Sequence, residues 1–308
     1  MQIYLPIADL PVNVFLILGM GLAVGFISGM FGIGGGFLMT PLLIFVGVNP
    51  GVAVESVASH IAASSCSGAI SYWRRNAVDP PLALMLLGGG ILGTATGVWL
   101  FTVMRALDQL DLMIGLSYLT LLSVVGSLMA SESIRAILRA RSGRPVVLRR
   151  AGSHLWFHGL PIKFRFKRSR IYVSAIPIWV IGFIIGFIGA IMGIGGGFLL
   201  VPMLIYFLRV PTATVIGTSM VLTLVTMASA TVMHAVTNHQ VDAVLALILM
   251  VGGVIGAQFG ARAGHKMAGE WLRLLLGLLV LLVGLRFAYQ LTINPQELYS
   301  LRMAEGTP

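Results

Sequence analysis

Residues 25–41 read GFISGMFGIGGGFLMTP, and residues 186–202 read GFIGAIMGIGGGFLLVP. Eleven of the 17 positions are identical at an offset of 161 residues. Further along the chain the offset becomes 163, since the Val-Asp pair that ends at Asp79 matches the pair that ends at Asp242. The chain therefore consists of two related halves, an internal repetition that is typical of secondary transporters.

Both halves are too apolar for a soluble protein of this size. Of the 308 residues, 57% are hydrophobic and 10% are charged, whereas soluble domains carry about 25% charged residues. Two short apolar runs, 37–47 and 198–208, either cross the bilayer or re-enter it. The sequence predicts an all-α polytopic membrane protein with about 8–10 membrane segments. Eight longer runs approach the roughly 20 residues that span a bilayer: 12–31, 52–72, 82–103, 112–130, 174–192, 212–236, 243–261 and 271–290.

The basic residues gather at the centre of the chain. Eleven of the 20 Lys and Arg residues lie between residues 131 and 174, as expected for a cytoplasmic loop. We therefore expect a first transmembrane repeat over residues 1–130, a basic cytoplasmic loop over residues 131–173 and a second transmembrane repeat over residues 174–308. Within the loop, apolar and basic residues alternate in the stretch Leu160–Val173, which predicts a small β-hairpin.

The loop charges also indicate how the two halves are related. With five segments in each half, Arg74, Arg75 and Arg262 share the cytoplasmic side with the central loop, and both termini lie outside. An even number of segments per half would place Arg262 on the external side, against the positive-inside rule. The charges therefore favour an inverted repeat.

The glycines of the repeated motif argue for a break in the helix. The sequence GIGGGF occurs at Gly32–Phe37 and at Gly193–Phe198, and each glycine costs a helix interior about 1 kcal/mol relative to alanine. Unwound backbone at membrane depth is tolerated where it lines a cavity or meets a ligand. The short helix that follows offers free N–H groups and a partial positive charge, which suit an anion; tight helix crossing is the alternative use of such glycines. We predict a substrate-binding site formed by Gly34, Gly35, Gly36 and Phe37 and by Gly195, Gly196, Gly197 and Phe198.

Polar side chains follow the glycines in both halves. Hydroxyl groups at Ser56, Ser59, Thr218 and Ser219 are further candidates for binding the substrate, although Ser and Thr also form ordinary hydrogen bonds between membrane helices. His60 is a candidate for coupling transport to protons, since ionisable residues at membrane depth are commonly functional. A neutral histidine bonded to a neighbouring carbonyl is the alternative.

Few other ionisable residues lie in the apolar runs. Glu55 is expected near the external end of its segment, in contact with solvent, and His234 near a loop. The sequence contains no H-E-x-x-H or G-x-S-x-G motif and no Cys/His cluster, so we expect no catalytic residue, no metal site and no cofactor. The single cysteine, Cys66, excludes a disulfide framework within the chain.

The doubled G-x-G-G-G-F-x-x-x-P element resembles the TauE/SafE family of sulfite exporters and permeases. The stretches Ala53–Ser56, Asn76–Asp79 and Val215–Ser219 also carry the resemblance, which extends from about Val12 to Tyr289. The first half reads Val-Glu-Ser-Val-Ala-Ser where the second reads Val-Ile-Gly-Thr-Ser, so the two sites are not equivalent.

The resemblance implies a multi-pass carrier of the bacterial inner membrane. Its substrate would be a small sulfur-containing anion such as sulfite, sulfoacetate or an organosulfonate, exported at the expense of an ion gradient. Expected partners are this anion and the lipid bilayer, with a homodimer left open and no nucleic acid. The alternatives are a passive anion channel and a carrier of another small anion, such as a carboxylate.

Overall fold

The computed structural model describes residues 2–31, 34–141, 163–166, 168–169, 171–206, 212–263, 277–278 and 280–289. Two compact units make up the chain: Met1–Ile114 with Pro145–Ala268, and Gly115–Arg144 with Gly269–Pro308. The helices of the first half are α1 (Val14–Phe31), α2 (Gly36–Val46), α3 (Pro50–Arg74), α4 (Pro80–Ala106) and α5 (Leu110–Arg141). Those of the second half are α6 (Ala175–Met192), α7 (Gly197–Tyr206), α8 (Thr212–Thr237) and α9 (Ala243–Ala263), and residues 280–289 are also helical.

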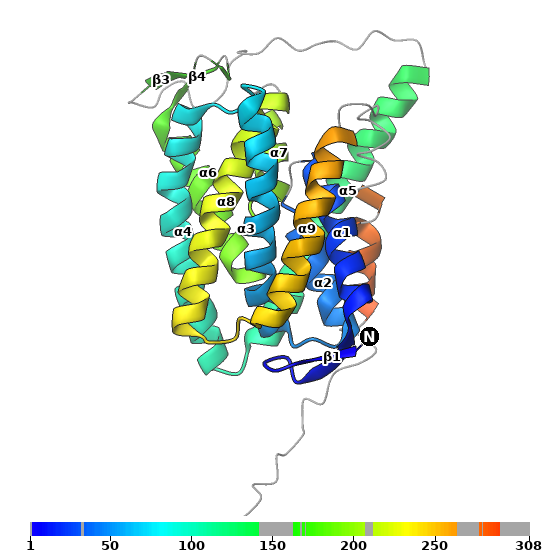
Figure 1. Cartoon of the computed structure of the whole chain (residues 1–308). Coiled ribbons are helices and arrows are strands. Elements are labelled where there is room, and N and C mark those ends of the chain that lie inside the picture. Colours follow the sequence, from blue (N-terminus) through cyan, green and yellow to red (C-terminus); the bar gives the residue numbers. More distant parts are fainter. Residues whose placement is uncertain are drawn as a thin grey trace, which may run out of the picture. The chain divides into compact units, whose positions relative to one another are not determined.

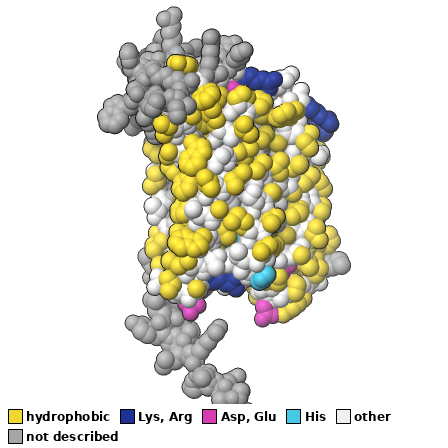
Figure 2. Space-filling view, turned by 90° about the vertical axis from the view of Figure 1, so that its left-hand side faces the viewer, with side chains coloured by type: hydrophobic (Ala, Val, Ile, Leu, Met, Phe, Trp, Pro, Cys, Tyr) yellow, Lys and Arg dark blue, Asp and Glu magenta, His cyan; other side chains and the backbone are white. Residues whose placement is uncertain are grey.

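The helices have the length and composition of membrane spans. Among the described residues, six are long and apolar enough to cross a bilayer: α1, α4, α6, α9, Leu110–Leu128 of α5 and Thr214–Thr237 of α8. Helix α3 is equally long, but it carries several Ser residues and His60 and is largely buried. On the face shown in Figure 2, hydrophobic side chains cover the middle and charged ones gather at the two ends. The chain is therefore an all-α polytopic membrane protein, as its sequence predicts.

The structure contains two β-hairpins, of which the sequence predicts only one. Strands β3 (Lys163–Phe166) and β4 (Ile171–Ser174) form the expected antiparallel hairpin, with Lys163 opposite Ser174. Strands β1 (Gln2–Leu5) and β2 (Leu10–Asn13) form a second hairpin, with Gln2 opposite Asn13. The offset of 161 residues relates the two, so each repeat begins with a hairpin that leads into its first helix.

Each hairpin is held by an aspartate from the other half. The Asp242 carboxylate accepts hydrogen bonds from the backbone N–H groups of Ile7 and Ala8, at 3.0 and 3.4 Å. It also accepts from two N–H groups in the first turn of α9. The Asp79 carboxylate accepts from the backbone N–H and the hydroxyl of Ser169, at 2.9 and 2.7 Å. The Val-Asp motif that the sequence repeats therefore joins the halves.

The first helix of each half packs against the fourth helix of the other. Helix α1 lies along α9, and α4 lies along α6. A Cβ added to Gly25 would lie 2.4 Å from the carbonyl oxygen of Gly253, and one added to Gly186 would lie 2.0 Å from that of Gly90. Small residues permit such backbone contact, which drives helix association in lipid, where hydrophobic burial does not.

Corresponding helices of the two halves run in opposite directions. The contacts between α1 and α9 advance together along both helices, from Gly21 against Leu249 to Gly29 against Ala257. Figure 1 shows α1, α3 and α9 running one way and α4, α6 and α8 the other way. An inverted repeat requires this arrangement of helices. The inversion of the complete halves stays a prediction, since most of α5 belongs to the second unit.

Replacing Gly93 by alanine should destabilise the folded protein, because its Cβ would lie 2.0 Å from the carbonyl oxygen of Phe183. We expect a lower Tm in detergent micelles, equivalent to about 1–3 kcal/mol. Gly19→Ala is the control, since no atom lies within 4 Å of that Cβ position, and alanine favours the helix by about 1 kcal/mol. Equal Tm values for the two variants would show that backbone contact does not stabilise the pair.

Candidate functional site

The glycine motifs break the helices in both halves. Helix α1 ends at Phe31 and α2 begins at Gly36, while α6 ends at Met192 and α7 begins at Gly197. Between them the backbone turns into the left-handed region, with φ of 86° at Gly34, 70° at Gly35, 61° at Gly193 and 68° at Gly195. Glycine adopts this conformation without the steric cost that other residues meet. With 11 and 10 residues, α2 and α7 are each only about 15 Å long, half the thickness of the hydrocarbon core.

The two breaks lie against each other. The rings of Phe37 and Phe198 stack with centroids 4.5 Å apart and planes 10° from parallel. A Cβ on Gly34 would lie 3.7 Å from the Cα of Gly195. One on Gly36 would lie 2.3 Å from the carbonyl oxygen of Gly193. The structure therefore brings the predicted glycines and phenylalanines into one buried crossing, in which the glycines serve both the break and the close approach.

Two hydroxyl groups at this crossing have no hydrogen-bond partner. Ser28 and Thr223 are fully buried, and their hydroxyl oxygens are unpaired within the described part of the chain. The Cβ of Ser28 lies 3.0 Å from the Cβ position of Gly35, and the methyl group of Thr223 lies 3.0–3.1 Å from those of Gly34 and Gly195. An unpaired buried hydroxyl costs about 1–3 kcal/mol. This cost is offset only if a polar group from elsewhere bonds to it, so the crossing is suited to a polar ligand.

Neither hydroxyl is among the site residues predicted from the sequence. Ser28 precedes the first glycine of its motif by one helical turn, and Thr223 lies one turn beyond Ser219. Both positions could have been found by following the helix face that leads to or from the glycines. The N-cap of α2 is Gly35, which has no side chain to occupy the first N–H groups of the helix. Those N–H groups and the two hydroxyls are all hydrogen-bond donors.

The four predicted hydroxyls have structural partners. The Ser56 hydroxyl accepts a hydrogen bond from the backbone N–H of Asp242 at 3.0 Å, and that of Thr218 accepts from the N–H of Asp79 at 3.2 Å. Ser59 and Ser219 donate to carbonyl groups one turn earlier, in their own helices. Ser56 and Thr218 therefore occupy equivalent places and connect the third helix of each half to the other half. Their role in substrate binding stays a prediction.

His60 contacts a backbone carbonyl. Its Nδ1 lies 2.7 Å from the carbonyl oxygen of Leu249, and its ring packs over Gly253, whose Cβ position is 2.2 Å from Cε1. The residue is fully buried, and its Nε2 is one of the unpaired atoms of the described residues. The carbonyl bond matches the alternative open from the sequence, and the coupling role stays a prediction.

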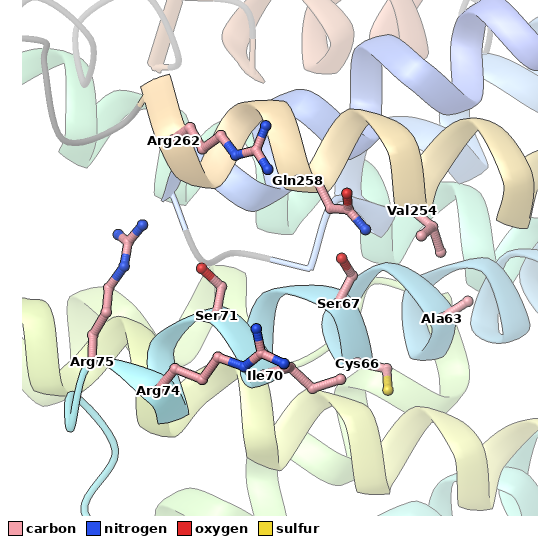
Figure 3. A pocket seen from close by; sticks show the side chains of 10 residues that line it. All are labelled: Ala63, Cys66, Ser67, Ile70, Ser71, Arg74, Arg75, Val254, Gln258 and Arg262. Carbon is pink, nitrogen blue, oxygen red and sulfur yellow. The ribbon is translucent and has the colours of Figure 1, made fainter.

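A pocket lined by arginines opens between α3 and α9. Its volume is about 780 Å³, and Figure 3 shows Gln258 and Arg262 of α9 facing Ser67 and Ser71 of α3. Ala63 lines it two residues beyond Ile61, whose side chain packs on Gly36 and Gly195. The pocket therefore begins within one helical turn of the crossing. The full lining is Ala63, Cys66, Ser67, Ile70, Ser71, Arg74, Arg75, Val254, Gln258 and Arg262.

The arginines belong to one end of the molecule only. The paired bonds of Ser56 with Asp242 and of Thr218 with Asp79 set an offset of 162 for α3 and 163 for α9. At these offsets Arg74 corresponds to Val236, and Arg262 corresponds to Trp99. The equivalent surface in the other half is therefore apolar, and only the predicted cytoplasmic end attracts anions.

The model of one protein family, described as sulfite exporter TauE/SafE, matches residues 17–287 of the chain. The chain belongs to the TauE/SafE family. A TauE/SafE chain with these membrane helices is a membrane transporter, in agreement with the sequence prediction and with the absence of catalytic motifs from the sequence.

Curated proteins similar to this TauE/SafE chain carry transporter names. The probable membrane transporter protein YunE of Bacillus subtilis (strain 168) is 25% identical over 279 residues, or 88% of this chain and 96% of that protein. A probable membrane transporter protein of Xylella fastidiosa (strain 9a5c) is 30% identical over 283 residues, or 89% of this chain and 94% of that protein. The sulfite exporter TauE/SafE family protein 3 of Arabidopsis thaliana is 31% identical over 77 residues, which cover 25% of this chain and 16% of that protein. No solved structure matches the chain significantly.

Ser56→Ala should lower the Tm, because the buried N–H of Asp242 loses its acceptor, at a cost of about 1–3 kcal/mol. Ser64→Ala is the matched control in the same helix, since the Ser64 hydroxyl only donates to the carbonyl of Ile61. Thermal unfolding and transport are measured on both variants. A Ser56→Ala protein with unchanged Tm and no transport would assign Ser56 to substrate binding instead.

Proposed function

We propose that this transporter carries a small sulfur-containing anion, such as sulfite or an organosulfonate, out of the cell across the bacterial inner membrane, driven by an ion gradient. The observation that carries the proposal is the buried crossing of the two helix breaks. There, the uncapped N-terminus of α2 and the unpaired hydroxyls of Ser28 and Thr223 meet. This set of groups donates hydrogen bonds and suits a ligand that only accepts them.

The shape of the substrate follows from the spacing of these donors. They come from α1, from α8 and from the start of α2, and so approach the crossing from different directions. A tetrahedral or pyramidal oxyanion has several acceptor oxygens and can bond to donors on different sides at once. A planar carboxylate has two oxygens and meets fewer of them. The donor arrangement therefore favours a sulfur oxyanion, in keeping with the description of the family.

The arginine-lined pocket supplies the approach from the predicted cytoplasmic side. Arg74, Arg75 and Arg262 surround its mouth, and Ser67 and Gln258 line it further in. A cleft with charge of one sign raises the local concentration of the opposite ion and its rate of association by tenfold or more. Anions that leave the cell would be collected here.

Transport also requires the crossing to open. The stacked rings of Phe37 and Phe198 and the close glycines fill the space between the breaks. A substrate enters only when one break moves away from the other, and this separation gives a carrier with alternating access, in contrast to a continuous pore. The half-length helices α2 and α7 follow the breaks directly and are the elements that would move with them.

Counterflow in proteoliposomes tests the proposal. Vesicles loaded with unlabelled sulfite or methanesulfonate should accumulate the labelled anion from outside, with saturation, whereas acetate should not compete. A passive channel gives no counterflow, and competition by acetate alone would move the substrate to the carboxylates. Either result would overturn the proposal.

Thr223→Val should lower transport and leave stability unchanged or higher, because it replaces an unpaired buried hydroxyl by a methyl group of similar size. Thr226→Val is the control, since Thr226 bonds to the carbonyl of Leu222 in its own helix. We expect the ratio of Vmax to KM for counterflow to fall about tenfold or more for Thr223→Val, as for the loss of one bond to a charged group. Equal transport by the two variants would remove Thr223 from the site.

Arg262→Gln should raise the KM for the anion several-fold, up to about tenfold, through the loss of one pocket charge. The effect should shrink at high ionic strength, because salt screens the charges of an open pocket. Arg262→Lys keeps the charge and should restore most of the affinity. Uptake kinetics at low and high salt are the measurement, and an unchanged KM for Arg262→Gln would contradict the role of the pocket.

A further inference from the structure

A buried acid–histidine pair lies near the start of α3, away from the crossing. Glu55 and His234 are both fully buried, and the Glu55 Oε1 atom lies 3.8 Å from the His234 Nδ1 atom. The other carboxylate oxygen, Oε2, accepts from the backbone N–H of Gln240 at 3.1 Å. Oε1 itself has no hydrogen-bond partner among the described residues. The sequence-based expectation that Glu55 contacts solvent is therefore wrong.

The surroundings of His234 fix its neutral form. Its Nε2 lies 3.2 Å from the carbonyl oxygen of Ala190, which can only accept, so Nε2 carries the hydrogen. Its Nδ1 lies 3.0 Å from the Asn238 side-chain nitrogen, which donates to it. The Asn238 amide is oriented by Thr102, whose hydroxyl donates to Oδ1 at 3.1 Å. A proton that binds Nδ1 must displace Asn238, and the acceptor available to it is the unpaired oxygen of Glu55.

Other charged groups near the pair are few. On α4, Arg105 donates to the carbonyl of Asn238 at 2.7 Å. At the start of α9, the Asp242 carboxylate is occupied by four backbone N–H groups. His239 is exposed in the connection between α8 and α9, and His60 lies further along α3 with its own carbonyl partner. Nothing in this set replaces Glu55 as the partner of His234.

The pair is suited to a proton and not to a metal ion. A metal ion needs several acceptor ligands, but the neighbours of Glu55 and His234 include the donors Gln240 N–H, the Asn238 amide and the cationic Arg105. Within the described residues no group of three or more His, Cys, Asp or Glu side chains could hold a metal. An ionised carboxylate with one unpaired oxygen is costly in a buried place. A proton on Oε1 removes this cost.

The pair also marks one end of the transporter. Glu55 and Arg74 are 19 positions apart on α3, or about 28 Å along the helix, so the pair and the arginine pocket lie at opposite ends. The equivalent of Glu55 in the other half is Gly217. The Cβ position of Gly217 lies 2.3 Å from the carbonyl oxygen of Ala77, just as Glu55 contacts Gln240, 163 residues later in the chain. The repeat therefore carries an acid at the predicted external end only.

We infer that Glu55 and His234 form the proton-binding site through which this carrier is coupled to the proton gradient. The inference rests on the proposed function as a carrier, and it assigns the coupling ion that the function requires. A proton from the external water binds the Glu55 carboxylate at Oε1, passes to His234 Nδ1 when Asn238 moves aside, and is released to water on the other side of the membrane. Intramembrane acid and histidine residues serve as such relays in other transporters.

The test separates coupling from carriage. Proteoliposomes containing the protein are loaded with a pH-sensitive dye, and the probe is methanesulfonate, which carries no proton near neutral pH. If only sulfite gives counterflow, sulfite replaces it and protein-free vesicles are subtracted. Wild-type vesicles should show anion-dependent proton flux, and an imposed pH gradient should stimulate anion flux at least several-fold. Absence of proton flux in wild-type vesicles that show counterflow overturns the proton site and leaves the carrier standing.

Two variants locate the site. Glu55→Gln keeps an oxygen for the N–H of Gln240, so it should retain counterflow at equal pH and lose both the proton flux and the stimulation by the gradient. His234→Gln should do the same if the protein folds. His239→Asn is the control, because His239 is exposed and adopts a φ of 56°, which Asn tolerates; it should behave as wild type. Retained stimulation in folded Glu55→Gln protein would overturn the assignment.

Discussion

The fold depends on backbone-to-backbone contact between helices that come from different halves. Lipid provides no hydrophobic force between helices, so α1 with α9 and α4 with α6 are held by close contact at glycines. These two pairs enclose α3 and α8, the helices that carry most of the buried polar groups. Because the pairs are fixed, the glycine breaks after α1 and α6 must arrive at the same place. The crossing is a consequence of the exchange of helices between the halves.

The same exchange explains the paired polar contacts. Each half lends an aspartate to the hairpin of the other and receives a backbone N–H bond at a hydroxyl of its own third helix, Ser56 or Thr218. Hydroxyls that look like a substrate site in the sequence are thus used to join the halves. The hydroxyls left for a ligand are those that no backbone group occupies, Ser28 and Thr223.

Sequence patterns predict the features that depend on the chain's local chemistry. Three consecutive glycines identify the breaks, the apolar runs identify the helices, and alternation identifies the hairpin at residues 163–174. The hairpin at residues 2–13 escapes prediction because its strands share almost no residues with their counterparts. The burial of Glu55 escapes for another reason: only the fold shows that Gln240 and His234, 185 and 179 positions away in the chain, lie beside it.

The interlocked helices also set a schedule for the growing chain. About 210 residues separate the end of α1 from the start of α9, and a ribosome that adds 5–20 residues per second needs roughly 10–40 s to make them. For all that time the glycine face of α1 must wait in lipid without its partner. Such a face is tolerable there because lipid chains fill the notches, and a residue large enough to fill them permanently would leave no room for α9 when it arrives.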